Sequence, residues 1–507
     1  MHGFDRRSFL AGASALAVAG TAMGAIPPLD SLAKDPTGSA SFDAVQERRK
    51  AAKARLTALE AALAQNPGGE SAIVLASVIH GARSEAGLTD FAYGDGNSVY
   101  PVTYRSGQHT QVAAGKAQAA EIDFETARIA ADTANGLLQP DFLLRRALTA
   151  VETAQFKAAQ SESGSQVQAA LESQIVALTA QLAVAGDRPG VGRLPQGRDY
   201  YAAQLGLALS SPVDPKAAMK LARQRLVAIW DELDDLLKAQ GLTSGPAHER
   251  LQRFARDPRY LYPQSDTGRT KMVADMNRML DDVLERLSVA FDLVDIPPSQ
   301  VERMTAAEEL AGVQGKRSGT SYIIDQRRTR DRPVWTLPSV VHHELYPGHM
   351  LPAAVRTTPA SALQARYGGS AWGEGWPVYA ETVAAEISAL DLWPEARIGF
   401  LQWQAFRTAR IVADIGLHTE DWSREEAVRN LNRLQGGPIY FITIDEDIDR
   451  MCLAPGANAA QGLSALSFLE RRAAARKIPG FDIKAFHRAA MASGPVSPDG
   501  FAAALKA

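Results

Sequence analysis

A twelve-residue stretch with the sequence SVVHHELYPGHM places His343, Glu344 and His349 within seven residues of one another. Further along the chain, the segment GEGWPVYAE supplies Glu374 and Glu381. A hydrolytic zinc ion is typically held by two neutral imidazoles and a carboxylate, with one position open for water. A second carboxylate can then take the proton of that water. Because both kinds of side chain gather here, the sequence predicts a metallohydrolase.

The spacing of the two histidines constrains the local backbone. Histidines four residues apart return to one face of a helix, but His343 and His349 are six residues apart. On a regular helix this spacing leaves the rings about 120° apart, which prevents them from sharing an ion. Pro347 cannot donate a hydrogen bond to the preceding turn, and Gly348 can adopt backbone angles closed to other residues. We therefore expect a bulge or kink that swings His349 back towards His343.

An ordinary helix and turn near the surface is the alternative for His342, His343 and His349. The preceding segment 332–341 argues against it. That segment begins like a strand and then becomes apolar, as a buried active-site helix requires.

For Glu374 the alternative is a carboxylate that caps a helix. Pro377 fits only the first turn of a helix, which predicts a helix that starts close to Glu374. Glu381 follows seven residues later and returns to the same helical face. Two carboxylates would then point towards the same site.

Taken together, these motifs resemble a known family. The pairing of His-Glu-x-x-Pro-Gly-His with Glu-Gly-Trp-x-x-Tyr-x-Glu is similar to a large bacterial group catalogued as domain of unknown function 885. Segments 104–107, 192–201 and 409–418 match as well. That group is in turn similar to zinc peptidases whose third ligand is a glutamate on a following helix. The resemblance covers nearly the whole chain and implies a large helical metallopeptidase-like fold.

Two departures from the family pattern bear on the site. The family usually has a second histidine where this chain has Met350, so His349 is the candidate for the second ligand. Near the C-terminus, segment 455–468 is longer than the family pattern and lacks its Tyr and Lys. We expect the metal site to be kept and the substrate contacts to differ.

Composition narrows the functional classes. The 507-residue chain carries 54 Lys and Arg against 57 Asp and Glu, a net charge of -3, with no basic block. Nucleic acid is therefore not an expected partner. Cys452 is the only cysteine in this sequence, so an intramolecular disulfide and a sulfur-rich metal site are both excluded.

The first residues are typical of an export signal. Arg6 and Arg7 precede a weakly apolar Ala- and Gly-rich run that extends to about Ile26. We interpret residues 1–25 as a twin-arginine signal, cleaved near Ala25, which predicts a periplasmic or otherwise exported protein. A membrane anchor is the alternative, but the run is short and weakly apolar for a span. The leader contains no cysteine for lipid attachment, so we expect no stable membrane association after cleavage.

Periodicity predicts a mainly α fold with a small β element. Helical patterns occupy 41–66, about three helices between 114 and 185, then 214–240 and 271–290. Residues 318–325 carry the one credible sheet signal, just before the metal-site helix. We expect Tyr322–Asp325 to form an edge strand that binds substrate backbone. Residues 40–505 are expected to form a single domain, which could be divided into two lobes around a cleft.

A second constellation lies further along the chain. Arg410, Asp414 and His418 are spaced by four and four, so they share one helical face and Asp414 can bridge its neighbours. Either His418 or Arg410 could face the cleft and donate to a developing oxyanion or a substrate carboxylate. Tyr440 is a weaker candidate for the same role. A surface ion pair beside a terminal histidine is the alternative.

The sequence therefore predicts an exported zinc-dependent hydrolase, most simply a peptidase. One zinc ion would be held by His343, His349 and Glu374, and would lower the pKa of bound water to about 7. Glu344 would act as general base, and Glu381 would orient a ligand histidine. Alternatives are a non-catalytic exported binding protein of the same fold, or a metallohydrolase of non-peptide amides or esters. The expected partner is a peptide or small amide substrate, and the oligomeric state stays open.

Overall fold

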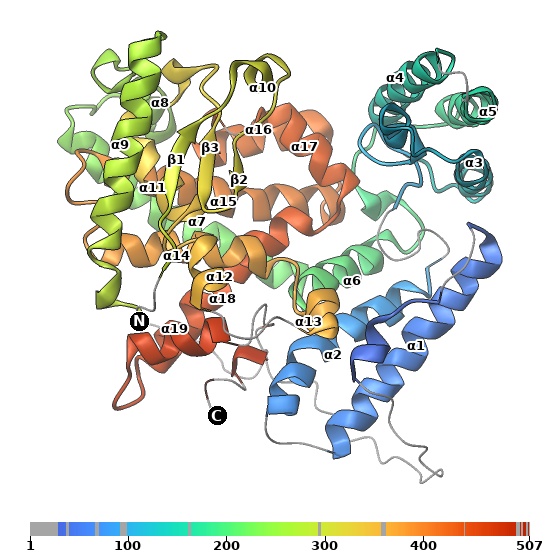
Figure 1. Ribbon diagram of the computed structural model, residues 1–507, viewed down its shortest axis with the longest axis horizontal. Helices are drawn as coiled ribbons and strands as arrows, with labels where there is room; N and C mark the ends of the chain where they lie inside the picture. Colours follow the sequence, from blue (N-terminus) through green and yellow to red (C-terminus); the bar gives the residue numbers. More distant parts are fainter. Residues whose placement is uncertain are drawn as a thin grey trace.

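The computed structural model describes residues 29–36, 40–65, 70–91, 99–160, 164–292, 296–355, 361–440, 442–492, 497, 500–502 and 505. Within these residues, helices dominate and one small sheet of three short strands is present (Figure 1). The prediction of a mainly α fold is thus confirmed. The expected export signal at 1–25 lies outside the described residues.

The elements follow one another in five groups. The first contains η1 (Leu29–Ala33), α1 (Phe42–Gln65) and α2 (Glu70–Leu88). The second contains η2 (Gln108–Ala114), α3 (Ala119–Ala134), α4 (Asp141–Ala158) and α5 (Ser165–Leu182). The third contains η3 (Val191–Arg193), α6 (Gly197–Leu209), α7 (Pro215–Ala239), α8 (Ala247–Phe254), η4 (Pro258–Tyr260), α9 (Asp266–Leu284) and η5 (Leu287–Val289).

The fourth group contains β1 (Gln300–Arg303), α10 (Ala306–Leu310), β2 (Lys316–Ser318) and β3 (Ser321–Ile324). The last contains η6 (Thr329–Asp331), η7 (Val334–Thr336), α11 (Leu337–Glu344), α12 (Met350–Val355), α13 (Ala362–Tyr367), α14 (Trp372–Glu386), α15 (Ala396–Thr419), α16 (Arg424–Gln435), α17 (Ile444–Leu453), α18 (Ala457–Ala475) and α19 (Ile483–Ala492).

The small sheet differs from the sequence prediction in its order. Its strands run β1–β3–β2, with β3 parallel to β1 and antiparallel to β2. The segment expected to be an edge strand, Tyr322–Asp325, therefore contributes to the central strand, and β1 and β2 form the two edges of the described sheet. The strand-like start of 332–341 is also wrong, because these residues form the short turn η7 and lead directly into α11. The strand order depends on the pairing of β1 with β3, two segments that are distant in sequence.

Helix α15 lies at the centre of the main body (Figure 1). It is buried on nearly every face, against α7, α16, α18 and α11, as expected for a helix in the core of a large protein. Gly399 permits the closest approach, since a Cβ there would lie 1.9 Å from the carbonyl oxygen of Trp335. Helix α15 therefore fixes the position of η7 and of the metal-site helix α11 that follows it.

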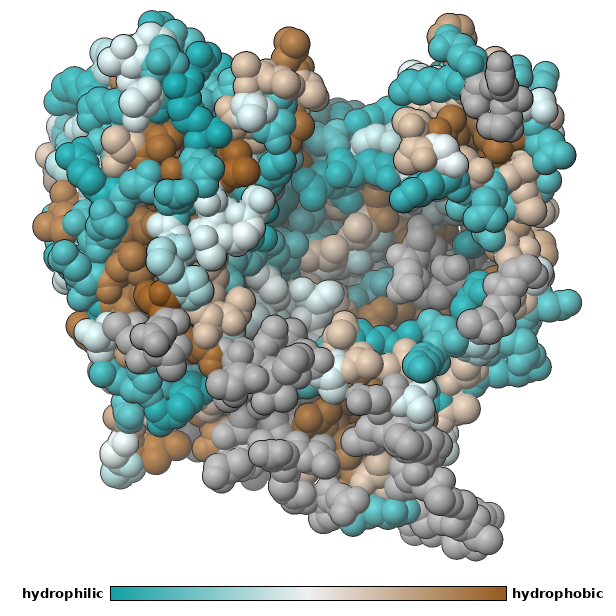
Figure 2. Space-filling view, viewed as in Figure 1, coloured by the Kyte–Doolittle hydropathy of each residue, from teal (hydrophilic) through white to brown (hydrophobic). Residues whose placement is uncertain are grey.

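Two groups of elements face each other across a hollow. Helices α3, α4 and α5 form a separate lobe with its own apolar core, which includes Ile122, Leu144, Val151 and Leu171 (Figure 1). The space-filling view shows the surface hollowed between this lobe and the part of the body that carries the sheet (Figure 2). The edge strand β2 lies on the side of the sheet nearer this lobe (Figure 1).

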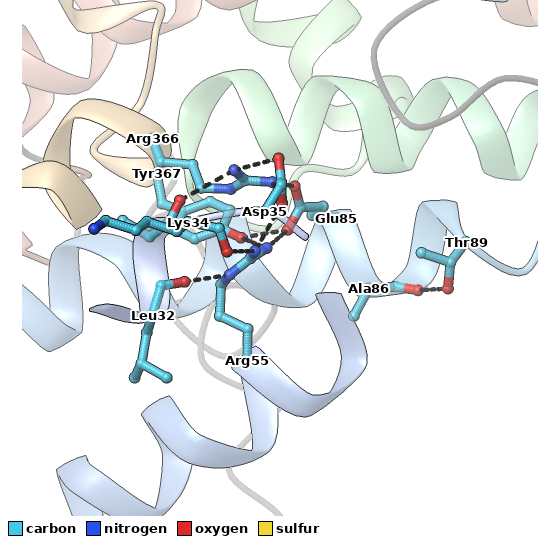
Figure 3. Close-up of polar contacts among 10 residues, drawn as sticks. Leu32, Lys34, Asp35, Arg55, Glu85, Ala86, Thr89, Arg366 and Tyr367 are labelled. Atoms are coloured by element: carbon cyan, nitrogen blue, oxygen red, sulfur yellow. Dashed lines mark hydrogen bonds and ion pairs between the residues drawn. The ribbon is translucent and has the colours of Figure 1, made fainter. Parts of the chain in front are cut away.

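A partly buried ion network, centred on Arg55, ties the N-terminal helices to α13 (Figure 3). Arg55 of α1 is 3% exposed and donates to Asp35 at 2.8 Å, to Glu85 at 2.8 Å and to the Tyr367 hydroxyl at 2.7 Å. Arg366 donates to the same two carboxylates. Because α13 stands in the chain between the helix after the histidine motif and the helix of the GEGW motif, this network anchors the connection between them.

Replacing Arg55 with methionine should lower the free energy of unfolding by about 3 kcal/mol, because it removes a buried partner of two carboxylates. Arg83→Met is the matched control. Arg83 pairs with Glu60 on the surface, where an ion pair contributes at most about 1 kcal/mol. Urea unfolding of both variants would measure the difference. Equal losses would show that the Arg55 network contributes no more than a surface pair.

Candidate metal centre

The turn after α11 brings the two histidines together. The helix ends at Glu344, and the N–H of His349 donates to the carbonyl of His343 at 3.0 Å. The expected distortion that brings His349 back to His343 is therefore present. It is a helix end followed by a turn, rather than a bulge or kink within the helix. Gly348 is required in this turn, since a Cβ there would lie 2.0 Å from the carbonyl oxygen of His343. The indole N–H of Trp376 donates to the carbonyl of Pro347 at 3.0 Å and holds the turn against α14.

Three side chains converge at this point. One ligand atom from each of His343, His349 and Glu374 lies within 4.8 Å of the other two. The Glu374 carboxylate is 3.4 Å from Nε2 of His343 and 3.7 Å from Nε2 of His349. Two ligands of a tetrahedral zinc ion, bound at about 2.0–2.1 Å, lie roughly 3.3 Å apart. These three groups can therefore meet one ion after small side-chain shifts.

Unpartnered polar atoms support this reading of the donor set. Nε2 of His349 is buried and has no hydrogen-bond partner. Nδ1–H of His343 donates to Glu381 at 2.9 Å, which leaves the lone pair of its Nε2 directed to the centre. A carboxylate that holds the far nitrogen of a ligand histidine is a regular companion of metal sites. The residues present therefore fit a divalent metal ion such as zinc.

Helix α14 supplies both carboxylates. Glu374 lies in its first turn and Glu381 follows two turns later on the same face, and both contact His343. The helix starts at Trp372, close to Glu374 as predicted, but Pro377 lies inside it rather than in its first turn. Gly375 lets α18 approach, because a Cβ there would lie 2.2 Å from Oγ of Ser464. The glycine and tryptophan of the GEGW motif thus position the glutamate beside them.

The charges of the site are coupled. Burial and Arg407 lower the pKa of His343, but Glu374 and Glu381 outweigh them and raise that pKa to about 9. Burial and the neighbouring His343 lower the pKa of His349 to about 2. Burial raises the pKa of Glu374, yet its hydrogen bond to His343 holds the pKa well below its usual range. In the metal-free protein two carboxylates therefore share one imidazolium. A divalent cation at Nε2 would replace its proton and leave the neutral ring, whose Nδ1–H donates to Glu381.

Glu344 lies beside the three candidate ligands without joining them. It lines a cavity of about 740 Å³ together with His343 and Glu374. Its carboxylate forms an ion pair with Arg317 of the edge strand β2, and Arg317 also lines the cavity. This position is suitable for a general base that is not a metal ligand.

Arg407 is a site residue that the sequence analysis missed. It projects from α15 into the same cavity, and its Nη2 lies 3.3 Å from Nε2 of His343. Burial lowers its pKa, and its Nε–H is buried with no acceptor. The available signal was an arginine in a largely apolar helix, three residues before Arg410. Because α15 is buried all round, spacing alone did not indicate which arginine faces the cavity.

Arg410, Asp414 and His418 are not brought to the cavity, and this corrects the prediction for them. Asp414 accepts from the backbone N–H groups of Gly456 and Ala459, and burial raises its pKa to about 6. The ring of His418 accepts from a backbone N–H and donates to a backbone carbonyl. These side chains are satisfied inside the protein core, so neither the catalytic role nor the alternative of a surface ion pair applies.

Arg410 and Tyr440 also use their hydrogen-bonding groups on other residues of the protein. Arg410 donates twice to Asp447, at 2.8 and 2.5 Å, rather than to Asp414. Tyr440 does line the cavity, but its hydroxyl donates to Asp325 at 2.6 Å. The donor role predicted for Tyr440 is therefore already used within the protein.

The fold and the site define a helical protein with a candidate His–His–Glu metal centre beside a three-stranded sheet. The sequence profile of the bacterial proteins of unknown function called DUF885 matches residues 18–505. The chain therefore belongs to this family. No curated protein matches the chain. None of the helices in the described part is both long and apolar enough to cross a membrane.

Solved structures share this fold. A crystal structure described as a "putative lipoprotein" from Colwellia psychrerythraea superposes with a TM-score of 0.74 at 21% identity, covering 92% of this chain and 90% of the other. A "putative lipoprotein of unknown function" from Shewanella oneidensis has a TM-score of 0.67 at 13% identity, covering 95% and 96%. At these identities the likeness concerns the fold alone.

Replacing Gly348 with alanine should weaken zinc binding by at least about tenfold, or 1.4 kcal/mol, because the new Cβ displaces His349 from the turn. Gly373→Ala is the control, since a Cβ at Gly373 meets nothing within 4 Å. Metal titration with a competing chelator would compare the two, and circular dichroism would confirm their folding. Zinc affinity in Gly348→Ala equal to that of the control would exclude His349 as a ligand.

Proposed function

We propose that this protein is a zinc-dependent hydrolase that cleaves peptide bonds. The observation that carries the proposal is the convergence of His343, His349 and Glu374 on one point, with Glu344 lining the same cavity. Two imidazoles and one carboxylate leave a fourth position open, which is the pattern of catalytic rather than structural zinc.

The residues around the site divide the chemistry among them. The zinc ion, when bound by its three ligands, supplies an activated water molecule and polarises the substrate carbonyl. Glu344 accepts the proton of that water and delivers it to the leaving amine. Arg317 forms an ion pair with Glu344 and keeps its carboxylate turned into the cavity. Glu381 fixes the ring of His343 through its Nδ1–H.

Arg407 takes the role that the sequence analysis gave to Arg410 or His418. Its guanidinium directs an N–H to Nε2 of His343, the atom proposed to hold the metal. Once that lone pair is engaged, the same N–H can donate to the substrate carbonyl oxygen as negative charge develops there. Because Arg407 is buried, its charge is poorly screened by solvent.

A peptide substrate is favoured by the edge strand. In the described part of the sheet, β2 pairs with β3 on one side only, and Lys316 and Arg317 of β2 line the cavity. An extended peptide can add to such an edge through main-chain hydrogen bonds. The twin-arginine leader and the lipoprotein descriptions of both similar structures support an exported location.

Glu344→Gln should leave zinc content nearly unchanged and reduce peptide hydrolysis by about 10²–10⁴-fold, because it removes the base and no ligand. Glu374→Gln should instead lose zinc. Elemental analysis and cleavage of a mixed peptide library would measure both. Loss of stoichiometric zinc in Glu344→Gln would make Glu344 a ligand. A zinc-loaded wild type that cleaves no peptide would favour the non-catalytic or non-peptide alternatives.

Arg407→Lys should lower kcat by about 10²–10³-fold, with zinc content and KM little changed, because the lost interaction belongs to the transition state. Added guanidine should partly restore kcat to Arg407→Ala by occupying the vacated space. Steady-state kinetics on each variant would measure these effects. A change in KM alone would assign Arg407 to substrate binding instead.

A further inference from the structure

The cavity beside the metal centre holds more positive than negative side chains. Six cationic and five carboxylate side chains line it, and every carboxylate already has a partner within the protein. The pairs are Asp325 with Arg327, Asp331 with Arg328, Glu344 with Arg317, and Glu374 and Glu381 with His343. A cation in this cavity that is paired with none of these carboxylates is therefore a candidate to bind an anionic group of the substrate.

Arg332 is such a cation. It is 7% exposed, and no carboxylate of the described residues lies within ion-pairing distance of it. Its Nε–H is buried without an acceptor. Its guanidinium carbon lies 3.5 Å from the centroid of the Tyr440 ring, and the group lines the cavity. The carboxylate that interacts with it electrostatically, Asp325, is already held by Arg327 and by the Tyr440 hydroxyl. Tyr322 and Tyr440 are the polar neighbours of Arg332, and burial raises the pKa of both, so neither carries a charge.

An isolated buried guanidinium is costly, because removal from water costs several kcal/mol unless an anion compensates. Arg407 would also lack an anionic partner once a metal ion neutralises Glu374 and Glu381. A substrate carbonyl placed at the metal centre could accept from the N–H of Arg407, whereas Arg332 is left without an anionic partner in the described part of the chain. A planar guanidinium that lines a cavity and is paired with no carboxylate of the described residues is suited to bind a carboxylate through parallel hydrogen bonds.

The size of the cavity indicates where that carboxylate lies in the substrate. A volume of about 740 Å³ is typical of pockets that enclose a small ligand, so it accommodates a few residues of a peptide. Every peptide with a free C-terminus carries one carboxylate there, whatever its side chains. A chain that ends inside the cavity would place this group near Arg332 while its last bonds lie at the metal centre.

We propose that Arg332 binds the C-terminal carboxylate of the substrate, so that the protein is an exopeptidase that removes one or two residues from free C-termini. This inference rests on the proposed function and specifies its substrate class. In the reaction the amide C–N bond breaks and the water oxygen joins the acyl carbon. One water proton passes through Glu344 to the leaving amine, which departs as an amino acid or dipeptide.

The wild-type enzyme provides the first test, with peptides of one sequence ending in a free acid or an amide. The free acid should have a kcat/KM about 10- to 100-fold higher, as expected for a lost charged hydrogen bond. Mass spectrometry should show release of one or two residues from the C-terminus. An amidated peptide with a glutamate near its end tests the other source of a carboxylate. Equal rates for acid and plain amide, or rescue by the glutamate alone, would overturn the proposal.

Arg332→Gln should abolish the preference for the free acid by raising KM for that peptide, while zinc content stays unchanged. Arg328→Gln is the matched control, because Arg328 lines the same cavity but is already paired with Asp331. It should keep the preference of the wild type. If Arg332→Gln fails to fold, the wild-type comparison of acid and amide still decides the question. Loss of the preference in both variants would indicate a general effect of charge and overturn the assignment to Arg332.

A binding measurement separates this inference from the proposed function. Zinc-loaded Glu344→Gln should bind the free-acid peptide at least about tenfold more tightly than its amide in calorimetry, without any turnover. If the free acid binds more tightly but the wild type hydrolyses no peptide, the carboxylate site is supported and the proposed peptidase activity is excluded. Hydrolysis of internal bonds with equal binding of acid and amide would keep the peptidase and reject the carboxylate site.

Discussion

The hydrogen bond from the N–H of His349 to the carbonyl of His343 is the constraint on which the metal centre depends. It closes a turn that replaces the next turn of α11, and so brings two histidines six residues apart to one point. The turn leaves no room for a side chain at Gly348, and Trp376 of α14 holds it from outside. Helix α14 therefore does two things at once: it supplies Glu374 to the site and stabilises the backbone that presents the histidines.

Local features of this arrangement could be predicted from the sequence. Helical periodicity, together with the glycine and proline residues that end helices, predicted α1, the three helices α3–α5, α7 and most of α9. The chemical requirement for two imidazoles and a carboxylate selected His343, His349 and Glu374, which the structure brings together. A Pro-Gly pair between the histidines predicted a backbone distortion. It did not distinguish a kink from a helix end, because either one accommodates a proline that has no N–H to donate to the preceding turn.

Long-range features were not predictable in the same way. The pairing of β1 with β3 is parallel and crosses α10 and β2 in sequence, so nothing local identified β3 as the central strand. On α15 the pattern of residues is buried on every face, and helical periodicity then loses its meaning as a guide to orientation. Contacts with other elements determine which arginine faces the cavity. Arg410 donates to Asp447, whereas Arg407 lies beside His343 at the metal centre.

Unsatisfied groups in a buried cavity indicate where ligands belong. Most charges around this cavity are already paired, since arginines form ion pairs with Asp325, Asp331 and Glu344. These carboxylates therefore do not require a further cation. The atoms without a partner include Nε2 of His349 and the Nε–H groups of Arg332 and Arg407. A buried polar atom without a partner costs about 1–3 kcal/mol, and a charge costs more. A protein that keeps such groups gives up stability when unliganded, and their chemistry matches a cation at the histidine and anionic or polarised oxygens at the arginines.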